Sequence, residues 1–338
     1  MSVSAAIYGL EGPELSADER AFFRDADPWG FILFARNVDR PKQLARLCVA
    51  LRDVVGRDAP IFIDQEGGRV QRLKPPIWRA TPPASVFGEL YSRDTEAALE
   101  AARLNHRMLA HELMASGIDA DCAPCLDLRI PGADGVIGDR SFGDDPQIIG
   151  ALGRAAMEGL HAGGVASVIK HIPGHGRADA DSHFALPKVG ESRDVLEATD
   201  FAPFKILSDA PMAMTAHVVY TAIDPDDPAT LSEAVIGDVI RNSMGFDGLL
   251  MTDDLSMRAL SGSLGKRAMR AFSAGCDMAL HCNGKRKEMV ALANVMPTLS
   301  GEALRRADAA AAIRQTPEAF DADEGLERLN ALIAPVLS

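Results

Sequence analysis

The chain contains 338 residues, 47% of them hydrophobic, and carries a formal net charge of -13 at pH 7. This acidic character argues against a nucleic-acid partner or an anionic membrane surface, because both are bound through basic patches that release counterions. No apolar run approaches the length of a membrane helix. The first residues lack a basic region followed by a long apolar core, so we expect a cytoplasmic protein, and we expect it to be a monomer.

The five cysteines are an odd number in a long chain and form no disulfide framework. Cys122 and Cys125 make a Cys-x-x-Cys pair, but no second pair follows at the spacing of zinc ligands. We therefore predict two buried core thiols here, with a redox or zinc site as the alternative.

Eight short apolar runs are candidate β-strands. In chain order they are Val3–Tyr8, Gly30–Phe34, Ile61–Asp64, Ile118–Ala123, Ala166–Lys170, Met212–Ala216, Leu249–Thr252 and Met278–His281. Helical patterns separate most of them, at Lys42–Val55, Glu96–Ser116, Pro146–Ala162, Asp194–Leu207, Glu233–Ser243 and Ser263–Ala274. Such alternation predicts a parallel sheet with right-handed crossovers, and eight units of this kind close a barrel.

The predicted fold is therefore of the α/β class, a single (β/α)8 TIM-type barrel. We assign residues 1–338 to one catalytic domain, with closing helices from about residue 286 that are joined by an acidic loop. Ser16 and Glu19 have the spacing of a capping box and mark the start of an early helix.

Polar residues gather at the carboxyl ends of the predicted strands. They are Arg36, Asn37, Asp64, Asp127, Arg129, Lys170, His171, His217, Asp253, Asp254 and His281. In a parallel barrel these ends share one face, and that face carries the active site. The plainer alternative is that each strand needs a polar residue where it reaches solvent.

The segment from Lys170 to His183 holds three histidines and two aspartates directly after an apolar strand, which makes it the first place to expect catalysis. One alternative is a metal-dependent hydrolase in which His171, His175 and His183 bind a divalent ion and Asp253 acts as base. Against it, no His-x-His follows the early strands, and Arg and Lys crowd the same mouth.

Two further motifs bring carboxylates and arginines to this face. In the first, Asp64 ends a strand and is followed by Gly67–Gly68 and two arginines, a combination suited to a ligand rich in hydroxyls. A phosphate loop is the competing interpretation, but the longer glycine spacing of nucleotide motifs is missing. In the second, Asp253 and Asp254 follow a strand, where adjacent side chains point to opposite sides, so we expect only one of them to face the mouth.

In this order the motifs resemble glycoside hydrolase family 3, in particular its single-domain bacterial β-N-acetylglucosaminidases of the NagZ type. The resemblance rests on Asp64–Arg72, Ala123–Asp127, Asp139–Gly143, Lys170–Gly176, Asp181–His183, Met214–His217 and Thr252–Met257. Each motif alone is weak, whereas the ordered set is specific.

The resemblance implies a role for each matched residue. Asp253 would be the nucleophile, and His183 would be the acid/base, paired with Asp181. The residues that would hold the non-reducing N-acetylglucosamine (GlcNAc) are Asp64, Arg72, Arg140, Lys170 and His171. The family needs no metal or other cofactor. His175 would be structural, and Arg177 departs from the small or acidic residue that is commonest at its position.

The implied activity is that of a retaining exo-β-N-acetylglucosaminidase. It would remove GlcNAc from 1,6-anhydroMurNAc-containing muropeptides during peptidoglycan recycling. A retaining glycosidase ordinarily uses two carboxyl groups, so the imidazole of His183, oriented by Asp181, would replace one of them. Two alternatives stay open besides the metal enzyme: a phosphorylase on the same scaffold, and a sugar-binding protein without catalysis.

Overall fold

The computed structural model describes residues 3–130, 132, 135–178, 180, 182 and 185–337. The predicted acid/base pair, Asp181 and His183, lies outside the described residues.

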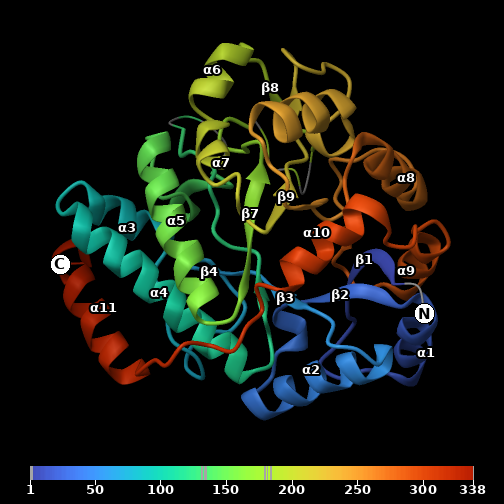
Figure 1. Cartoon of the computed structure of the whole chain (residues 1–338), viewed down its shortest axis with the longest axis horizontal. Coiled ribbons are helices and arrows are strands. Elements are labelled where there is room, and N and C mark those ends of the chain that lie inside the picture. Colours follow the sequence, from blue (N-terminus) through green and yellow to red (C-terminus); the bar gives the residue numbers. More distant parts are fainter. Residues whose placement is uncertain are drawn as a thin grey trace.

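Eight parallel strands form the wall of a barrel, and helices surround it (Figure 1). The strands are β1 (Ser4–Gly9), β2 (Pro28–Leu33), β3 (Ile61–Ile63), β6 (Ala120–Asp121), β7 (Ala166–Ile172), β9 (Met212–Thr215), β11 (Leu249–Met251) and β12 (Ala279–His281). Their order in the sheet is β11-β9-β7-β6-β3-β2-β1-β12, and all neighbours pair in parallel. Each strand falls on one of the eight predicted apolar runs.

The two edge strands of this sheet meet and close the wall. Met251 and Met278 form a parallel bridge, and the amide of Thr252 donates to the carbonyl of Met278 at 3.0 Å. The predicted (β/α)8 architecture is therefore confirmed. The assignment of residues 1–338 to one catalytic domain stays a prediction.

Helices follow most strands. They are α1 (Ala17–Ala26), α2 (Pro41–Val55), α3 (Ala84–Tyr91), α4 (Thr95–Ala115), α5 (Pro146–Ala162), α6 (Arg193–Ala198), α7 (Ala202–Ile206), the π-helix η4 (Ala234–Ser243), α8 (Leu264–Ala274), α9 (Arg286–Ala293), α10 (Gly301–Ala311) and α11 (Ala322–Leu337). The predicted capping box of α1 is present: the amide of Ser16 donates to the Glu19 carboxylate at 3.0 Å, and the amide of Glu19 donates to Ser16 Oγ at 3.2 Å.

One predicted helix, Asp194–Leu207, is in fact two, α6 and α7. Thr199 lies between them with φ -121° and ψ -84°, which is not a helical conformation. Pro203 follows four residues later, and in a continuous helix its ring would collide with the carbonyl of Thr199. The break leaves Asp200 buried between the two helices, 1% exposed.

Alternate residues of the strands divide the core into two parts. In β1, Ala5 and Ile7 belong to the cluster inside the barrel, whereas Ala6 and Tyr8 pack outward against the helices. Cys122 belongs to the inner cluster, and both it and Cys125 are buried and free. The prediction of buried core thiols is confirmed for this pair.

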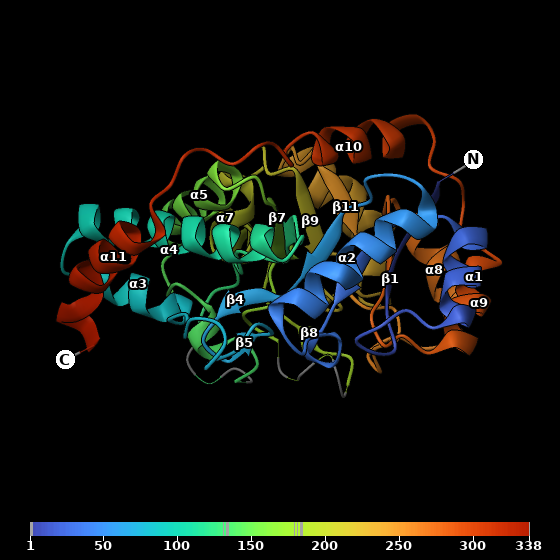
Figure 2. The same cartoon turned by 90° about the horizontal axis from the view of Figure 1, so that it is seen from below.

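The two ends of the barrel differ. Ala307 and Ala310 of α10 pack against the interior cluster at one end. Figure 2 shows α10 on the side opposite the short strands β4 (Gln65–Gly67), β5 (Val70–Gln71) and β8 (Lys188–Val189). The open mouth lies on the side of these short strands, where the carboxyl ends of the barrel strands are.

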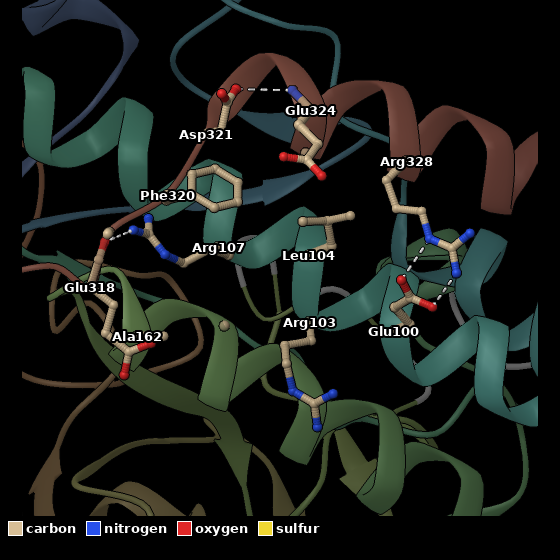
Figure 3. Close-up of a pocket in the computed structure, with 13 residues that line it drawn as sticks. Glu100, Arg103, Leu104, Arg107, Ala162, Glu318, Phe320, Asp321, Glu324 and Arg328 are labelled. Carbon is tan, nitrogen blue, oxygen red and sulfur yellow. Dashed lines mark hydrogen bonds and ion pairs between the residues drawn. The ribbon is translucent and has the colours of Figure 1, made fainter.

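The C-terminal segment lies outside the barrel wall, against α4 (Figure 3). The guanidinium of Arg107 stacks over the ring of Phe320 at 4.3 Å and donates to the carbonyl of Glu318. Arg328 of α11 makes two 2.7 Å hydrogen bonds with the carboxylate of Glu100. A cavity of about 440 Å³ lies between these segments, away from the barrel mouth. Within the described part of the chain, no helix has the length and apolarity to span a bilayer.

Candidate active site

A pocket of about 270 Å³ opens at the carboxyl ends of the strands. Six of the eight residues predicted for the site line it together: Asp64, Arg72, Arg140, Lys170, His171 and Asp253. The other two, Asp181 and His183, lie outside the described residues. Asp64 and Asp253 are 189 positions apart in the chain, yet they share one small cavity. They do so because the carboxyl ends of parallel strands lie on one face of the barrel.

Local structure places each of these side chains. Asp64 directly follows β3, and Arg72 directly follows β5 in the β4–β5 hairpin. Arg140 ends the 3-10 helix η2 (Gly138–Arg140). Lys170 and His171 lie at the carboxyl end of β7, just before its last residue, Ile172. Asp253 lies two residues beyond the end of β11.

Lys170 lies at the centre of a buried charge network. Its side chain is 2% exposed, and Nζ lies 2.8 Å from Asp64 Oδ1 and 2.7 Å from Glu66 Oε1. Burial alone would lower the pKa of Lys170, but the two carboxylates outweigh it and hold that pKa above its ordinary value. The ammonium is therefore charged at neutral pH.

Asp64 is held by two cations. Besides Lys170, Arg72 donates to Asp64 Oδ2 at 3.0 Å. Burial would raise the pKa of Asp64, but the two cations hold it well below its ordinary range. The carboxylate can therefore only accept hydrogen bonds, which suits recognition of sugar hydroxyls.

Glu66 lines the same pocket and was not among the site residues predicted from the sequence. Its carboxylate makes a bidentate pair with Arg140, from Nε at 2.8 Å and from Nη2 at 2.7 Å, in addition to the contact with Lys170. Burial would raise the pKa of Glu66, but Arg140 and Lys170 lower it to about 2. The numbers of predicted charges could have indicated Glu66. Lys170, Arg72 and Arg140 were three predicted cations with one predicted sugar-binding carboxylate, and buried cations need further counter-ions.

Asp127 orients His171. Its Oδ2 accepts from His171 Nδ1 at 2.7 Å, and its Oδ1 accepts from the backbone amide of His175 at 2.6 Å. Burial would raise the pKa of Asp127, but His171 and these hydrogen bonds hold it well below its ordinary range. Since an ionised carboxylate only accepts, Nδ1 of His171 is the donor, and Nε2 is the ring nitrogen left for a ligand.

Asp253 and Asp254 both contribute to the pocket wall, which corrects the expectation that only one of them faces the mouth. The reason is the bend at Asp253, two residues after β11, where the chain is no longer extended and the amide of Asp254 donates to Asp253 Oδ1 at 2.7 Å. The two carboxylates nevertheless differ. That of Asp254 accepts from Ser256 Oγ at 2.6 Å and from the amide of Cys282 at 3.2 Å, so it holds the loop together.

Among the described residues, Cys125, Asp127 and His171 form the one group whose ligand atoms lie close enough to share a metal ion, within 4.8 Å of one another. Their polar atoms already bond to each other: Cys125 Sγ donates to Asp127 Oδ2 at 3.3 Å, beside the His171 bond. Burial also raises the pKa of the Cys125 thiol well above its ordinary value, which opposes the thiolate that a metal would bind. The cluster is explained as support for His171.

Comparison with known proteins adds independent information. The family model for the glycosyl hydrolase family 3 N terminal domain matches residues 3–314. A β-hexosaminidase of Alkalilimnicola ehrlichii is 42% identical over 290 residues, which cover 84% of this chain and 82% of that protein. Native NagZ from Neisseria gonorrhoeae has 33% identity and a TM-score of 0.86, covering 100% of this chain and 99% of that one. The same protein in complex with N-trifluoroacetyl-D-glucosamine has 33% identity and a TM-score of 0.85, covering 99% and 97%.

Proposed function

Because the chain belongs to glycoside hydrolase family 3, as a β-N-acetylhexosaminidase, we propose that it removes one non-reducing GlcNAc at a time with retention of configuration. The observation that carries this proposal is the convergence of Asp253 and five predicted sugar-binding residues on one pocket. A volume of about 270 Å³ suits a single sugar ring, which favours an exo-acting enzyme.

In the first step, the carboxylate of Asp253 attacks the anomeric carbon and forms a glycosyl ester. His183, oriented by Asp181, gives a proton to the leaving oxygen as the glycosidic bond breaks. In the second step, His183 takes a proton from water, which attacks the same carbon and releases Asp253. The roles of His183 and Asp181 rest on the family resemblance.

The sugar is held by groups whose charges are already paired. Asp64 accepts from hydroxyls, while Arg72, Arg140 and Lys170 donate to oxygen atoms of the sugar, and Nε2 of His171 completes the set. Because ion pairs hold these donors and acceptors before the ligand arrives, little reorganisation is needed when charge develops at the ring.

Water, and not phosphate, is the proposed acceptor. Each of the four cationic side chains that line the described pocket pairs with a carboxylate: Arg69 with Asp139, Arg72 and Lys170 with Asp64, and Arg140 with Glu66. These four cations are matched in number by the four carboxylates that line the same pocket, Asp64, Glu66, Asp253 and Asp254, so its described wall offers no excess of positive charge to an incoming phosphate. Assays in phosphate buffer should therefore yield free GlcNAc, and formation of GlcNAc-1-phosphate would identify the phosphorylase instead.

The natural substrates that we propose are GlcNAc-1,6-anhydroMurNAc muropeptides, cleaved in the cytoplasm during peptidoglycan recycling. The support is the similarity to NagZ and to bacterial β-hexosaminidases. We propose no metal or other cofactor.

The proposal is tested with 4-nitrophenyl N-acetyl-β-glucosaminide and its glucoside counterpart. The purified protein should strongly prefer the acetamido sugar. Asp253→Ala should lower kcat at least about a thousandfold, because the nucleophile is lost. His183→Ala should slow turnover most for poor leaving groups, which need the proton. Unchanged hydrolysis by Asp253→Ala would refute the covalent mechanism.

A further inference from the structure

Arg69 is left unexplained by the proposed mechanism. It lies on the β4–β5 hairpin, three residues before Arg72, and its side chain is 47% exposed at the mouth of the pocket. Its Nε donates to Asp139 Oδ1 at 2.9 Å, and Nη2 donates to the carbonyls of Gly135 and Ile137 at 3.0 Å each. All of these partners belong to the segment that leads into Arg140.

The hairpin that carries Arg69 is rigidly supported. Gly67 and Gly68 have φ values of +106° and +54°, a left-handed conformation that glycine adopts without strain. A Cβ at either position would strike Pro82 or Pro83, at 2.4 Å and 2.7 Å respectively. Gly67 and Gly68 therefore form a tight turn that packs against Pro82 and Pro83. This structural role differs from that of glycines in a phosphate-binding loop.

Glutamine side chains fix the base of the same hairpin. Gln65 Oε1 accepts from the amides of Arg72 and Leu73 at 2.8 and 3.0 Å. Gln71 is buried and its Oε1 accepts from the amide of Thr81 at 3.2 Å. The hairpin can therefore act as a fixed support for the segment that its exposed side chains contact.

Two ion pairs of opposite polarity join this support to the neighbouring segment. Glu66 of the hairpin binds Arg140, and Arg69 of the hairpin binds Asp139. The first pair is buried, with side chains 7% and 12% exposed, and the second is exposed at 47% and 44%. We call Glu66, Arg69, Asp139 and Arg140 the clasp.

We propose that Arg69 is a positioning residue for sugar binding, which acts by holding residues 135–139 so that Arg140 stays aimed into the pocket. This inference rests on the proposed function. An exposed ion pair alone contributes little, but Arg69 also donates to the consecutive carbonyls of Gly135, Val136 and Ile137. Lysine at this position would keep the charge and lose the forked geometry.

The test compares Arg69→Met, Arg69→Lys and the matched control Arg154→Met. Arg154 also makes an exposed arginine–aspartate pair, with Asp209, and donates to the carbonyl of Ile206, but it lies on α5. With 4-nitrophenyl N-acetyl-β-glucosaminide, Arg69→Met should raise KM roughly three- to tenfold and change kcat less than about twofold. Arg69→Lys should fall between it and the wild type, and Arg154→Met should leave KM unchanged.

Two further measurements separate positioning from direct contact with the leaving group. Free GlcNAc has no leaving group, so its inhibition constant should rise with KM in Arg69→Met. In an Arg140→Met background, Arg69→Met should add little, because its effect passes through Arg140. A normal KM in Arg69→Met, an unchanged inhibition constant, or full additivity with Arg140→Met would each overturn the inference. Failure of the proposed function gives a different result from failure of this inference, because the wild-type protein itself would then be inactive on the acetamido substrate.

Discussion

At the scale of single residues, the candidate site is a set of mutual counter-ions. Lys170, Arg72 and Arg140 are ion-paired with Asp64 and Glu66 before any ligand binds. The cations and Asp64 were predicted from their positions at strand ends and from the resemblance. Glu66 was missed because it lies on the short strand β4, next to the hairpin turn, where an acidic residue is ordinarily solvated.

Glu66→Gln should destabilise the fold, because the change leaves Arg140 buried without its bidentate partner. Breaking one side of a buried ion pair costs about 3–5 kcal/mol, and the loss should appear in urea unfolding followed by circular dichroism. Glu158→Gln is the control, since Glu158 pairs with Arg103 at the surface and should cost less than about 1 kcal/mol. Equal effects of the two changes would contradict the assigned role.

The same variant should change the acid sensitivity of the protein. The pKa of Glu66 is lowered from 4.5 to about 2, so the folded state binds its proton less readily than the unfolded state. Its contribution to stability is present above pH 4.5 and is lost as the pH falls towards 2. Wild-type stability should thus fall more steeply with acidification in this window than that of Glu66→Gln.

At the scale of elements, the break between α6 and α7 lets a buried carboxylate bind an arginine from another segment. Arg177 Nε donates to Asp200 Oδ2 at 2.6 Å. Asp200 is 1% exposed, and burial raises its pKa even with this partner. Arg177, which the family resemblance marks as a departure from the commonest residue at its position, therefore ties the start of the segment after β7 to the α6–α7 junction.

Arg177→Met should destabilise the protein by about 3–5 kcal/mol at neutral pH, because a buried carboxylate loses its cation. An acid whose pKa is raised by folding opposes the folded state once it ionises, so the destabilisation should shrink as the pH is lowered. Thermal unfolding across this pH range checks both points. Arg177→Lys, which keeps the charge, should cost less, and a loss independent of pH would argue against the assignment to Asp200.

At the scale of the whole molecule, the active pocket and the C-terminal attachment are separate. The pocket lies at the barrel mouth, whereas α11 packs outside the wall on α3 and α4 (Figures 1 and 3). Leu329 and Ile333 of α11 are buried, at 1% and 4% exposure. Their burial stabilises the fold without contacting the groups that we propose to bind sugar.

Leu329→Ala should therefore lower the free energy of unfolding by about 2–5 kcal/mol, as large-to-small changes in a core do. Its KM and kcat at 25 °C should stay within about twofold of the wild type, because the pocket keeps its shape. Denaturant unfolding and steady-state kinetics on the same preparation check this pair of outcomes. A large change in KM would show that α11 is coupled to the pocket.

The sequence alone determined the strand and helix pattern and the face on which the site lies. Apolar periodicity is a local property, and a parallel barrel sends every strand end to one mouth, so the pattern by itself predicts that Asp64, Lys170, His171 and Asp253 lie together. Arg72 and Arg140 lie on a hairpin and a 3-10 helix, and only the family resemblance predicted them for the same pocket. The contacts between distant segments were decided only by the tertiary structure. The partnership of Glu66 with Arg140, 74 residues apart, the clasp around Arg69 and the link from Arg177 to Asp200 depend on how loops pack, and no local pattern encodes that packing.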